Sequence, residues 1–294
     1  MNLDALWDFD RPAVSEERFQ AALGIATDED ALILRTQLAR ALGLQQRFDE
    51  AAAELATVEA VGDLPPLART YLHLERGRLL NSGGKPDEAK PEFLRALEEA
   101  EAAKLDYQAA DAAHMLAIVE PGEAQIGWAQ RALAIAEASD DSRARRWVGS
   151  VTHNLGWTLH DLGRHEEALA LFERALAFRE EQYRAQQGDA EAVRVGRWTV
   201  ARGLRSVGRF EEALAIQREL EDTGPEDGYV SEEIAELLFA LGREQDARPH
   251  FARAHALLAA DALLAESDPG RLHRLAVLGA KGGGRGGVGE PGAL

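Results

Sequence analysis

One pattern of small and apolar residues recurs along this chain of 294 residues, and it restricts the possible folds more than any other feature. The clearest copy reads Leu155-Gly156-x-x-Leu159, then Gly163, then Ala168-x-x-x-Phe172-x-x-Ala175-Leu176. Comparable copies contain Ala89 and Ala247, and looser ones contain Ala51, Ala124 and Ala213. Apolar residues at three- and four-residue spacing make amphipathic helices, and small residues let two helices approach closely. The pattern therefore predicts helix hairpins that stack, each covering the apolar face of the next.

This pattern resembles the tetratricopeptide repeat (TPR), a helix–turn–helix unit of 34 residues. The alanines of the second helices are spaced by 38, 35, 44, 45 and 34 residues, so two units are longer than the family repeat. Long second helices of this kind resemble the extended repeats of kinesin light chain and its bacterial relatives. The resemblance implies an all-α fold, an α-solenoid in which about six TPR-like hairpins form a right-handed superhelix between two capping helices.

The sequence suggests four parts. We expect a capping segment at residues 1–27, a repeat array at 28–260, a capping helix at 261–281 and a disordered Gly-rich tail at 282–294. Ser15 is expected to cap a short first helix, and Asp268 before Pro269 predicts the start of the last helix. The expected hairpins span residues 32–65, 70–104, 106–139, 141–187, 190–225 and 228–260.

Composition excludes several classes of function. The 51 acidic residues outnumber the 33 Lys and Arg, which gives a formal charge of −18, whereas nucleic-acid binding needs a dense basic face. No apolar run approaches the roughly 20 residues of a membrane span, and the first ten residues lack the apolar core of a signal peptide. Without cysteine there is no disulfide, thiolate zinc site or cysteine nucleophile. We expect a bacterial, cytoplasmic protein that binds neither nucleic acid nor membrane.

The sequence contains none of the common catalytic or nucleotide-binding motifs. His153 and His160 are seven residues apart, which is about 10 Å along a helix, so they need a third ligand such as His114 to hold a metal ion. We expect no metal, no cofactor and no enzymatic activity. An enzyme with a small-molecule site that contains these histidines remains the less favoured alternative.

In TPR proteins the first helices of successive units line a concave face that binds peptides or partner segments, and the resemblance implies the same here. Trp and Arg commonly anchor interfaces, and Arg binds carboxylates through paired hydrogen bonds. We therefore expect a scaffold that binds a protein or peptide segment of acidic character. The candidate groove residues are Arg40, Tyr71, Arg78, His114, Arg146, His153, Asn154, Trp157, His160, Trp198, Arg202 and Arg205.

Several alternatives remain open at this level. Trp157 and Trp198 fit packing between neighbouring repeats as well as ligand binding. A second cluster, Arg143 to Trp147, fits a solvated first helical turn as well as a ligand role. A ligand- or peptide-responsive TPR regulator is the alternative function, and the oligomeric state is not indicated. Because the second helices are acidic and the middle first helices are rich in Arg, we expect an acidic outer surface around a locally basic groove.

Overall fold

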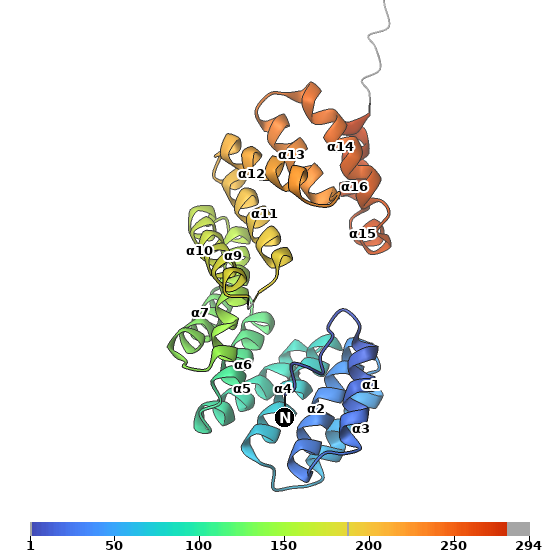
Figure 1. Ribbon diagram of the computed structural model, residues 1–294, viewed down its shortest axis with the longest axis vertical. Helices are drawn as coiled ribbons and strands as arrows, with labels where there is room; N and C mark the ends of the chain where they lie inside the picture. Colours follow the sequence, from blue (N-terminus) through green and yellow to red (C-terminus); the bar gives the residue numbers. More distant parts are fainter. Residues whose placement is uncertain (1, 187, 281–294) are drawn as a thin grey trace, which may run out of the picture. The chain divides into compact units, whose positions relative to one another are not determined.

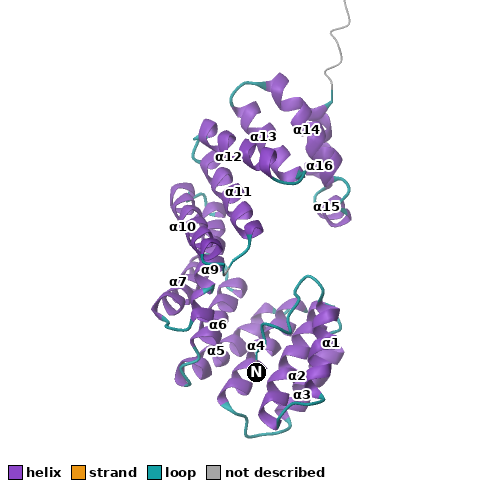
Figure 2. Cartoon of the chain, in the orientation of Figure 1, coloured by secondary structure: helices purple, strands orange, loops and turns teal. Residues whose placement is uncertain are grey.

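The computed structural model describes residues 2–186 and 188–280, and these residues form helices and no strand (Figures 1 and 2). The expected all-α fold built from helix hairpins is confirmed. The segment expected to be a disordered tail, 282–294, lies outside the described residues. Among the described residues, no helix combines the length and the apolar content that crossing a membrane requires.

The chain divides into two compact units, residues 1–158 and residues 159–294, and the boundary falls within α9. In the first unit, α2 packs on α3, α4 on α5 and α6 on α7, while α1 covers α2 and the short α8 lies against α6 and α7. The helices that begin in this unit are α1 (Pro12–Leu23), α2 (Asp28–Leu44), α3 (Phe48–Glu59), α4 (Pro66–Ser82), α5 (Pro86–Ala102), α6 (Asp106–Val119), α7 (Glu123–Ala138), α8 (Ser142–Arg145) and α9 (Trp147–Asp161).

The second unit continues the hairpin pattern. Within it, α10 packs on α11, α11 on α12, α12 on α13 and α13 on α14, and α16 covers α14. Its first hairpin contains α10, which at 20 residues accounts for one of the long repeat spacings. The helices of this unit are α10 (His165–Arg184), α11 (Ala190–Ser206), α12 (Phe210–Thr223), α13 (Gly228–Ala240), α14 (Glu244–Leu258), α15 (Ala262–Ser267) and α16 (Pro269–Gly279).

The turns before the second helices repeat one local structure. Gly163 and Gly208 have φ angles of 76° and 79°, the left-handed conformation that ends a helix and favours glycine. The next residue is basic and pairs with an acidic residue in the first turn of the following helix: the distance from Arg209 Nη2 to Glu212 Oε2 is 2.7 Å. A short sequence motif thus sets both the turn and the helix start.

Small residues at the helix–helix contacts are buried, as the repeat pattern predicts. Ala51, Ala89 and Ala168 have no exposed surface, and Ala213 and Ala247 are equally buried. The register predicted for the third copy is wrong, because Ala124 is exposed. Its position is taken by Ile126, which is 6% exposed and follows the N-cap Gly122 by four residues, as Ala168 follows Arg164.

The two ends of the array are capped by helices, but the first helix does not start as expected. Pro12 occupies the first turn of α1, where its missing N–H costs nothing. Ser15 therefore lies inside the helix, and its buried hydroxyl accepts a hydrogen bond from the Asp8 N–H at 2.7 Å. At the other end, the Asp268 carboxylate accepts from the Arg271 N–H at 3.0 Å and caps α16 as predicted.

Candidate functional site

The first unit contains a cavity of about 350 Å³ between its first helices and the segment that precedes α1. Its wall combines five aromatic rings with three arginines and one carboxylate. The lining residues are Leu3, Asp4, Trp7 and Phe9 before α1, Gln37 and Arg40 of α2, Tyr71 of α4, Tyr107 of α6, Arg143 of α8, Arg146, and Trp147 and Ser150 of α9.

Aromatic rings and guanidinium groups pack against one another on this wall. Trp7 and Phe9 are stacked with ring centroids 4.5 Å apart, and the Arg40 guanidinium carbon lies 5.3 Å and 5.2 Å from the two centroids. The Arg143 guanidinium carbon lies 4.3 Å from the Tyr107 ring centroid. Such contacts hold flexible arginine side chains in place while leaving their N–H groups available.

The wall carries more positive than negative charge. Arg40, Arg143 and Arg146 face a single acidic lining residue, Asp4, which lies 3.6 Å from Arg143 and 3.5 Å from Arg146. Two buried donor atoms on the lining residues, Arg143 Nε and Trp147 Nε1, have no hydrogen-bond partner within the described part of the chain. The cavity is therefore suited to a group that accepts hydrogen bonds and carries negative charge.

Glu75, Arg78 and Asp111 form a buried charged triad close to this wall, and Glu75 and Arg78 line a second, smaller cavity together with Arg40. The Arg78 guanidinium is 2.5 Å from a carboxylate oxygen of each acid, and the acidic side chains are only 0% and 2% exposed. Burial raises the pKa of Glu75, and the charges of Arg78 and Arg40 counteract this effect only in part. Burial acts to lower the pKa of Arg78, but Asp111 and Glu75 outweigh it and raise that pKa. Arg78 thus stays charged at every working pH.

The two tyrosines of the wall stay protonated. Burial, helped by Asp111 and Tyr71 and opposed by the charges of Arg40 and Arg143, raises the pKa of Tyr107 to about 12. Burial also raises the pKa of Tyr71, whose hydroxyl accepts a hydrogen bond from Gln108 Nε2 at 2.9 Å. Both hydroxyls therefore serve as neutral polar groups beside the arginines.

His114 packs against the cavity wall, with its ring centroid 5.2 Å from that of Trp147. Burial lowers the pKa of His114, Asp111 raises it and Arg78 lowers it, and the net shift is downward. With this lowered pKa, His114 binds fewer protons in the folded protein than in the unfolded chain. The stability that His114 contributes is therefore present above the ordinary pKa of histidine and is lost as the pH falls through the lowered pKa.

We therefore expect acidification from about pH 7.5 to about pH 5.5 to destabilise the wild type more than a His114→Gln variant. Urea unfolding of both proteins at the two pH values measures this difference. The other histidines are common to both proteins and cancel, and His273→Gln, at an exposed position, is the control. Parallel pH dependence in all three proteins would contradict the assignment.

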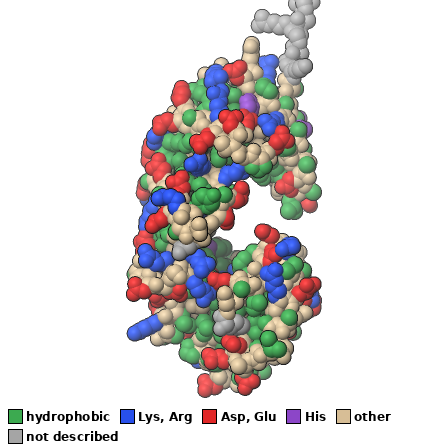
Figure 3. All heavy atoms as spheres, in the orientation of Figure 1, with side chains coloured by type: hydrophobic (Ala, Val, Ile, Leu, Met, Phe, Trp, Pro, Cys, Tyr) green, Lys and Arg blue, Asp and Glu red, His purple; other side chains and the backbone are tan. Residues whose placement is uncertain are grey.

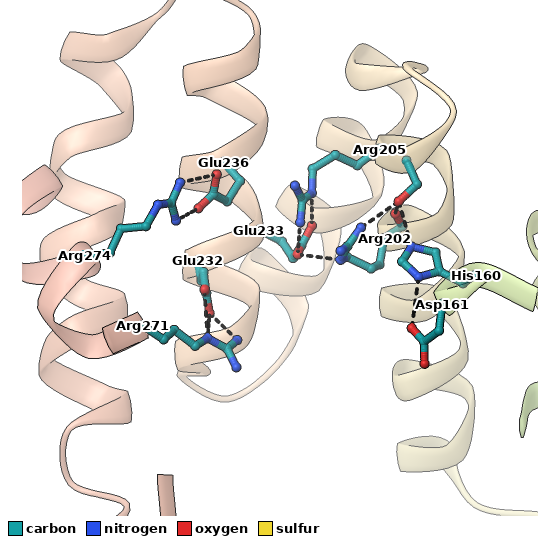
Figure 4. Close-up of polar contacts among 10 residues, drawn as sticks. His160, Asp161, Arg202, Arg205, Glu232, Glu233, Glu236, Arg271 and Arg274 are labelled. Atoms are coloured by element: carbon teal, nitrogen blue, oxygen red, sulfur yellow. Dashed lines mark hydrogen bonds and ion pairs between the residues drawn. The ribbon is translucent and has the colours of Figure 1, made fainter. Parts of the chain in front are cut away.

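In the second unit, the candidate groove arginines are paired with acids of α13 (Figure 4). Arg205 forms two hydrogen bonds to the Glu233 carboxylate, at 2.8 Å and 2.9 Å, and Arg202 Nε lies 3.4 Å from the same group. Burial and the neighbouring Arg205 lower the pKa of Arg202, and Glu233 counteracts them. The positive charge expected here is thus largely compensated within the unit.

Arginine–glutamate pairs also join α16 to α13. Arg271 of α16 forms a bidentate contact to Glu232, with distances of 2.5–3.1 Å, and Arg274 pairs with Glu236 (Figure 4). Acidic and basic side chains are also interspersed on the molecular face drawn in Figure 3. The charge segregation expected from the sequence is therefore weaker than predicted, because arginines on one helix meet acids on the next.

The other histidines and tryptophans of the candidate list lie on α9 and α11. Trp157 Nε1 donates to His153 Nε2 at 3.2 Å within α9, and Asn154 on the same helix is exposed. His160 contacts the Ser206 hydroxyl at 2.8 Å, and Trp198 is partly buried on α11. Within residues 2–186 and 188–280, no three His, Asp or Glu side chains are arranged to hold a metal ion.

The structure brings part of the candidate list together and adds residues that the sequence pattern left out. Arg40, Tyr71 and Arg146 line the cavity, His114 packs against Trp147 of its wall, and Arg78 lines the neighbouring smaller cavity together with Arg40. The remaining candidates do not line it. The lining residues that the candidate list left out include Trp7 and Phe9, which precede the repeats, and Arg143 and Trp147, whose cluster the sequence left open between a solvated turn and a ligand role.

Three models of the tetratricopeptide repeat match the chain, over residues 33–57, 126–181 and 186–261. The chain belongs to the tetratricopeptide repeat family. The matches begin in α2 and extend into α14, so TPR hairpins occur in both units. No curated protein sequence matches this TPR chain significantly.

Many solved structures share the TPR fold of this chain. BtubC from P. vanneervenii is 19% identical, with a TM-score of 0.58 over 76% of this chain and 91% of that chain. The apo form of the quorum sensor NprR from B. thuringiensis is 16% identical, with a TM-score of 0.61 over 94% and 78%. NprR in complex with its cognate peptide NprX is 16% identical, with a TM-score of 0.51 over 94% and 81%. At these identities the similarity establishes the fold.

Proposed function

We propose that this TPR protein is a non-enzymatic binding module, and that the cavity of its first unit holds a peptide or protein segment through an acidic group. The observation that carries the proposal is the wall of five aromatic rings and three arginines around a volume of about 350 Å³. Aromatic and arginine side chains are the residue types that contribute most to binding at interfaces. A cavity of this size accommodates one or two side chains of a bound segment.

Two further points support this proposal. The lining residues do not bring a nucleophile together with a base, which favours binding over catalysis. NprR, a structure with the same fold, is described as binding a cognate peptide, and a peptide is a ligand of the same general kind. An acidic group is favoured because the arginines of the wall outnumber its single carboxylate.

The test uses a panel of fluorescein-labelled acidic and basic peptides, with affinity measured by fluorescence anisotropy. We expect acidic peptides to bind, and the double variant Arg143→Ala, Arg146→Ala to weaken their binding by about tenfold, because each partly exposed charge pair contributes roughly 1 kcal/mol or less. Binding should also weaken as ionic strength rises.

Arg145→Ala is the matched control, because Arg145 is exposed on the same short helix and does not line the cavity. It should bind like the wild type. Equal loss in the control and the double variant, or undiminished binding in the double variant, would place the binding site elsewhere.

A further inference from the structure

The segment Leu3–Phe9, which precedes α1, forms one wall of the cavity and also brings chemical groups that the cavity is suited to bind. Its residues Leu3, Asp4, Trp7 and Phe9 line the cavity together with residues of α2, α4, α6, α8 and α9. The other lining residues contain no carboxylate, and Asp4 is the lining acid that pairs with Arg143 and Arg146. Asp4 therefore occupies the position at these two arginines that an external carboxylate would have to take.

The two halves of this segment are held with different strength. Trp7 packs edge-on against the fully buried Phe19, with centroids 5.0 Å apart, and its Nε1 donates to Gln37 Oε1 at 3.2 Å. Asp4 lies in a turn closed by the hydrogen bond from the Leu6 N–H to the Leu3 carbonyl. The Trp7 end is thus anchored in the hydrophobic core of α1 and α2.

Leu3 and Leu6, on either side of Asp4, pack against the same core, but the Asp4 carboxylate itself is held by solvent-accessible ion pairs. The Asp4 side chain is 42% exposed, and its partners Arg143 and Arg146 are 37% and 58% exposed at distances of 3.6 Å and 3.5 Å. Pairs of this kind are weak and are easily replaced by another carboxylate. An incoming acid can therefore take over Arg143 and Arg146 without removing Trp7 from the core.

We propose that the turn around Asp4 is an internal competitor, and that the partner is a peptide segment with an acidic side chain close to an aromatic one, as in the chain's own Asp4 and Trp7. This inference rests on the proposed function and specifies its ligand class and regulation. The partner's carboxylate replaces Asp4 at Arg143 and Arg146, and its aromatic side chain packs on the exposed wall beside Tyr107 and Trp147. Intramolecular occupation lowers the apparent affinity, because only the fraction of molecules with the turn displaced is competent to bind.

The probe for this inference is a fluorescein-labelled synthetic peptide with the sequence of residues 3–9, LDALWDF, and its variant with Asn in place of the first Asp. We expect Asp4→Asn protein to bind the acidic probe about two- to fivefold more tightly than the wild type, because a weak competing pair is removed. The Asn-containing probe should bind weakly to both proteins. Asp10→Asn is the matched control, since Asp10 is exposed, does not line the cavity and changes the net charge equally.

A second measurement follows the turn directly. Because the chain has no cysteine, Asn2→Cys creates a single site for a fluorescent dye beside Asp4. We expect saturating acidic probe to increase the mobility of the dye, seen as a lower anisotropy, and the Asn-containing probe to leave it unchanged.

The outcomes separate this inference from the proposed function. If wild type and Asp4→Asn bind the acidic probe equally and the dye does not respond, the internal competitor is rejected while the binding module stands. If the probe binds neither protein, but other acidic peptides bind through Arg143 and Arg146, the ligand class is rejected. If no acidic peptide binds any variant, the proposed function fails together with this inference.

Discussion

Replacing Arg78 with methionine is expected to lower the free energy of unfolding by about 3–5 kcal/mol, because it leaves buried carboxylates without their partner. Arg78 is the only cation whose hydrogen bonds reach both Glu75 and Asp111 among the described residues, and these acids are 0% and 2% exposed. Urea unfolding followed by circular dichroism measures the loss. The effect should be larger than that of any surface arginine.

Arg76→Met is the matched control for this variant. Arg76 lies two residues earlier on α4 and pairs with Glu59 at 2.7 Å, but the Glu59 side chain is 59% exposed. Exposed pairs contribute roughly 0–1 kcal/mol, so this variant should unfold nearly like the wild type. Similar losses in both variants would show that the triad is not the source of the effect.

Replacing all three members of the triad tests whether the loss in Arg78→Met comes from the unpaired buried carboxylates. A Glu75→Leu, Arg78→Met, Asp111→Leu variant removes every buried charge together, and such replacements are often neutral or stabilising. We expect it to recover most of the stability that Arg78→Met alone loses. Its cavity wall should also keep the aromatic residues in place, which a peptide-binding measurement checks.

Replacing Gly77 with alanine is expected to lower the free energy of unfolding by about 1–3 kcal/mol through overpacking. A Cβ atom at this position of α4 meets three atoms of the Phe93 ring at 2.5–2.8 Å. Phe93 has no exposed surface, so its ring cannot move aside without disturbing the α4–α5 hairpin. The clash outweighs the gain of up to about 1 kcal/mol that alanine brings to a helix interior.

Gly127→Ala is the control with the opposite sign. A Cβ atom at Gly127, in α7, meets nothing within 4 Å, so only the gain in helix propensity remains. We expect this variant to be slightly more stable than the wild type. Equal shifts for the two alanine variants, measured by urea unfolding, would contradict the close approach of α4 and α5.

The hairpin architecture was predictable because its signals are local. Helical spacing of apolar residues, a left-handed glycine such as Gly163 and a buried alanine such as Ala168 act within a few turns of one another. The prediction failed where those signals were weak. In the third copy the spacing predicts Ala124 as the contact residue, but Ala124 is exposed and Ile126 is buried in its place. The sequence also predicts Ser15 as a cap, but Pro12 already starts the helix.

The candidate site was predictable only in part. Projection of the first helices identified Arg40 and Tyr71, because a helix presents such positions on one face. Arg146 also lines the cavity, but it lies at the junction of α8 and α9 and not on a helix face. Projection could not show that α13 neutralises Arg205 through Glu233, because that contact joins residues 28 positions apart.

By itself, the sequence determined the helical hairpins, their turns and the TPR family, since each depends on periodicity and on short-range contacts. Only the tertiary structure decided which arginines remain available to a ligand. Arg202 and Arg205 are committed to Glu233, whereas Arg40, Arg143 and Arg146 line a cavity beside aromatic rings. The physical reason is that an arginine can bind a ligand only where acidic side chains of the protein do not already pair with it. Those acidic side chains come from distant parts of the chain. Trp7, which packs on Phe19, and Asp4, which pairs with Arg143 and Arg146, form the side of this cavity that comes from the segment before α1.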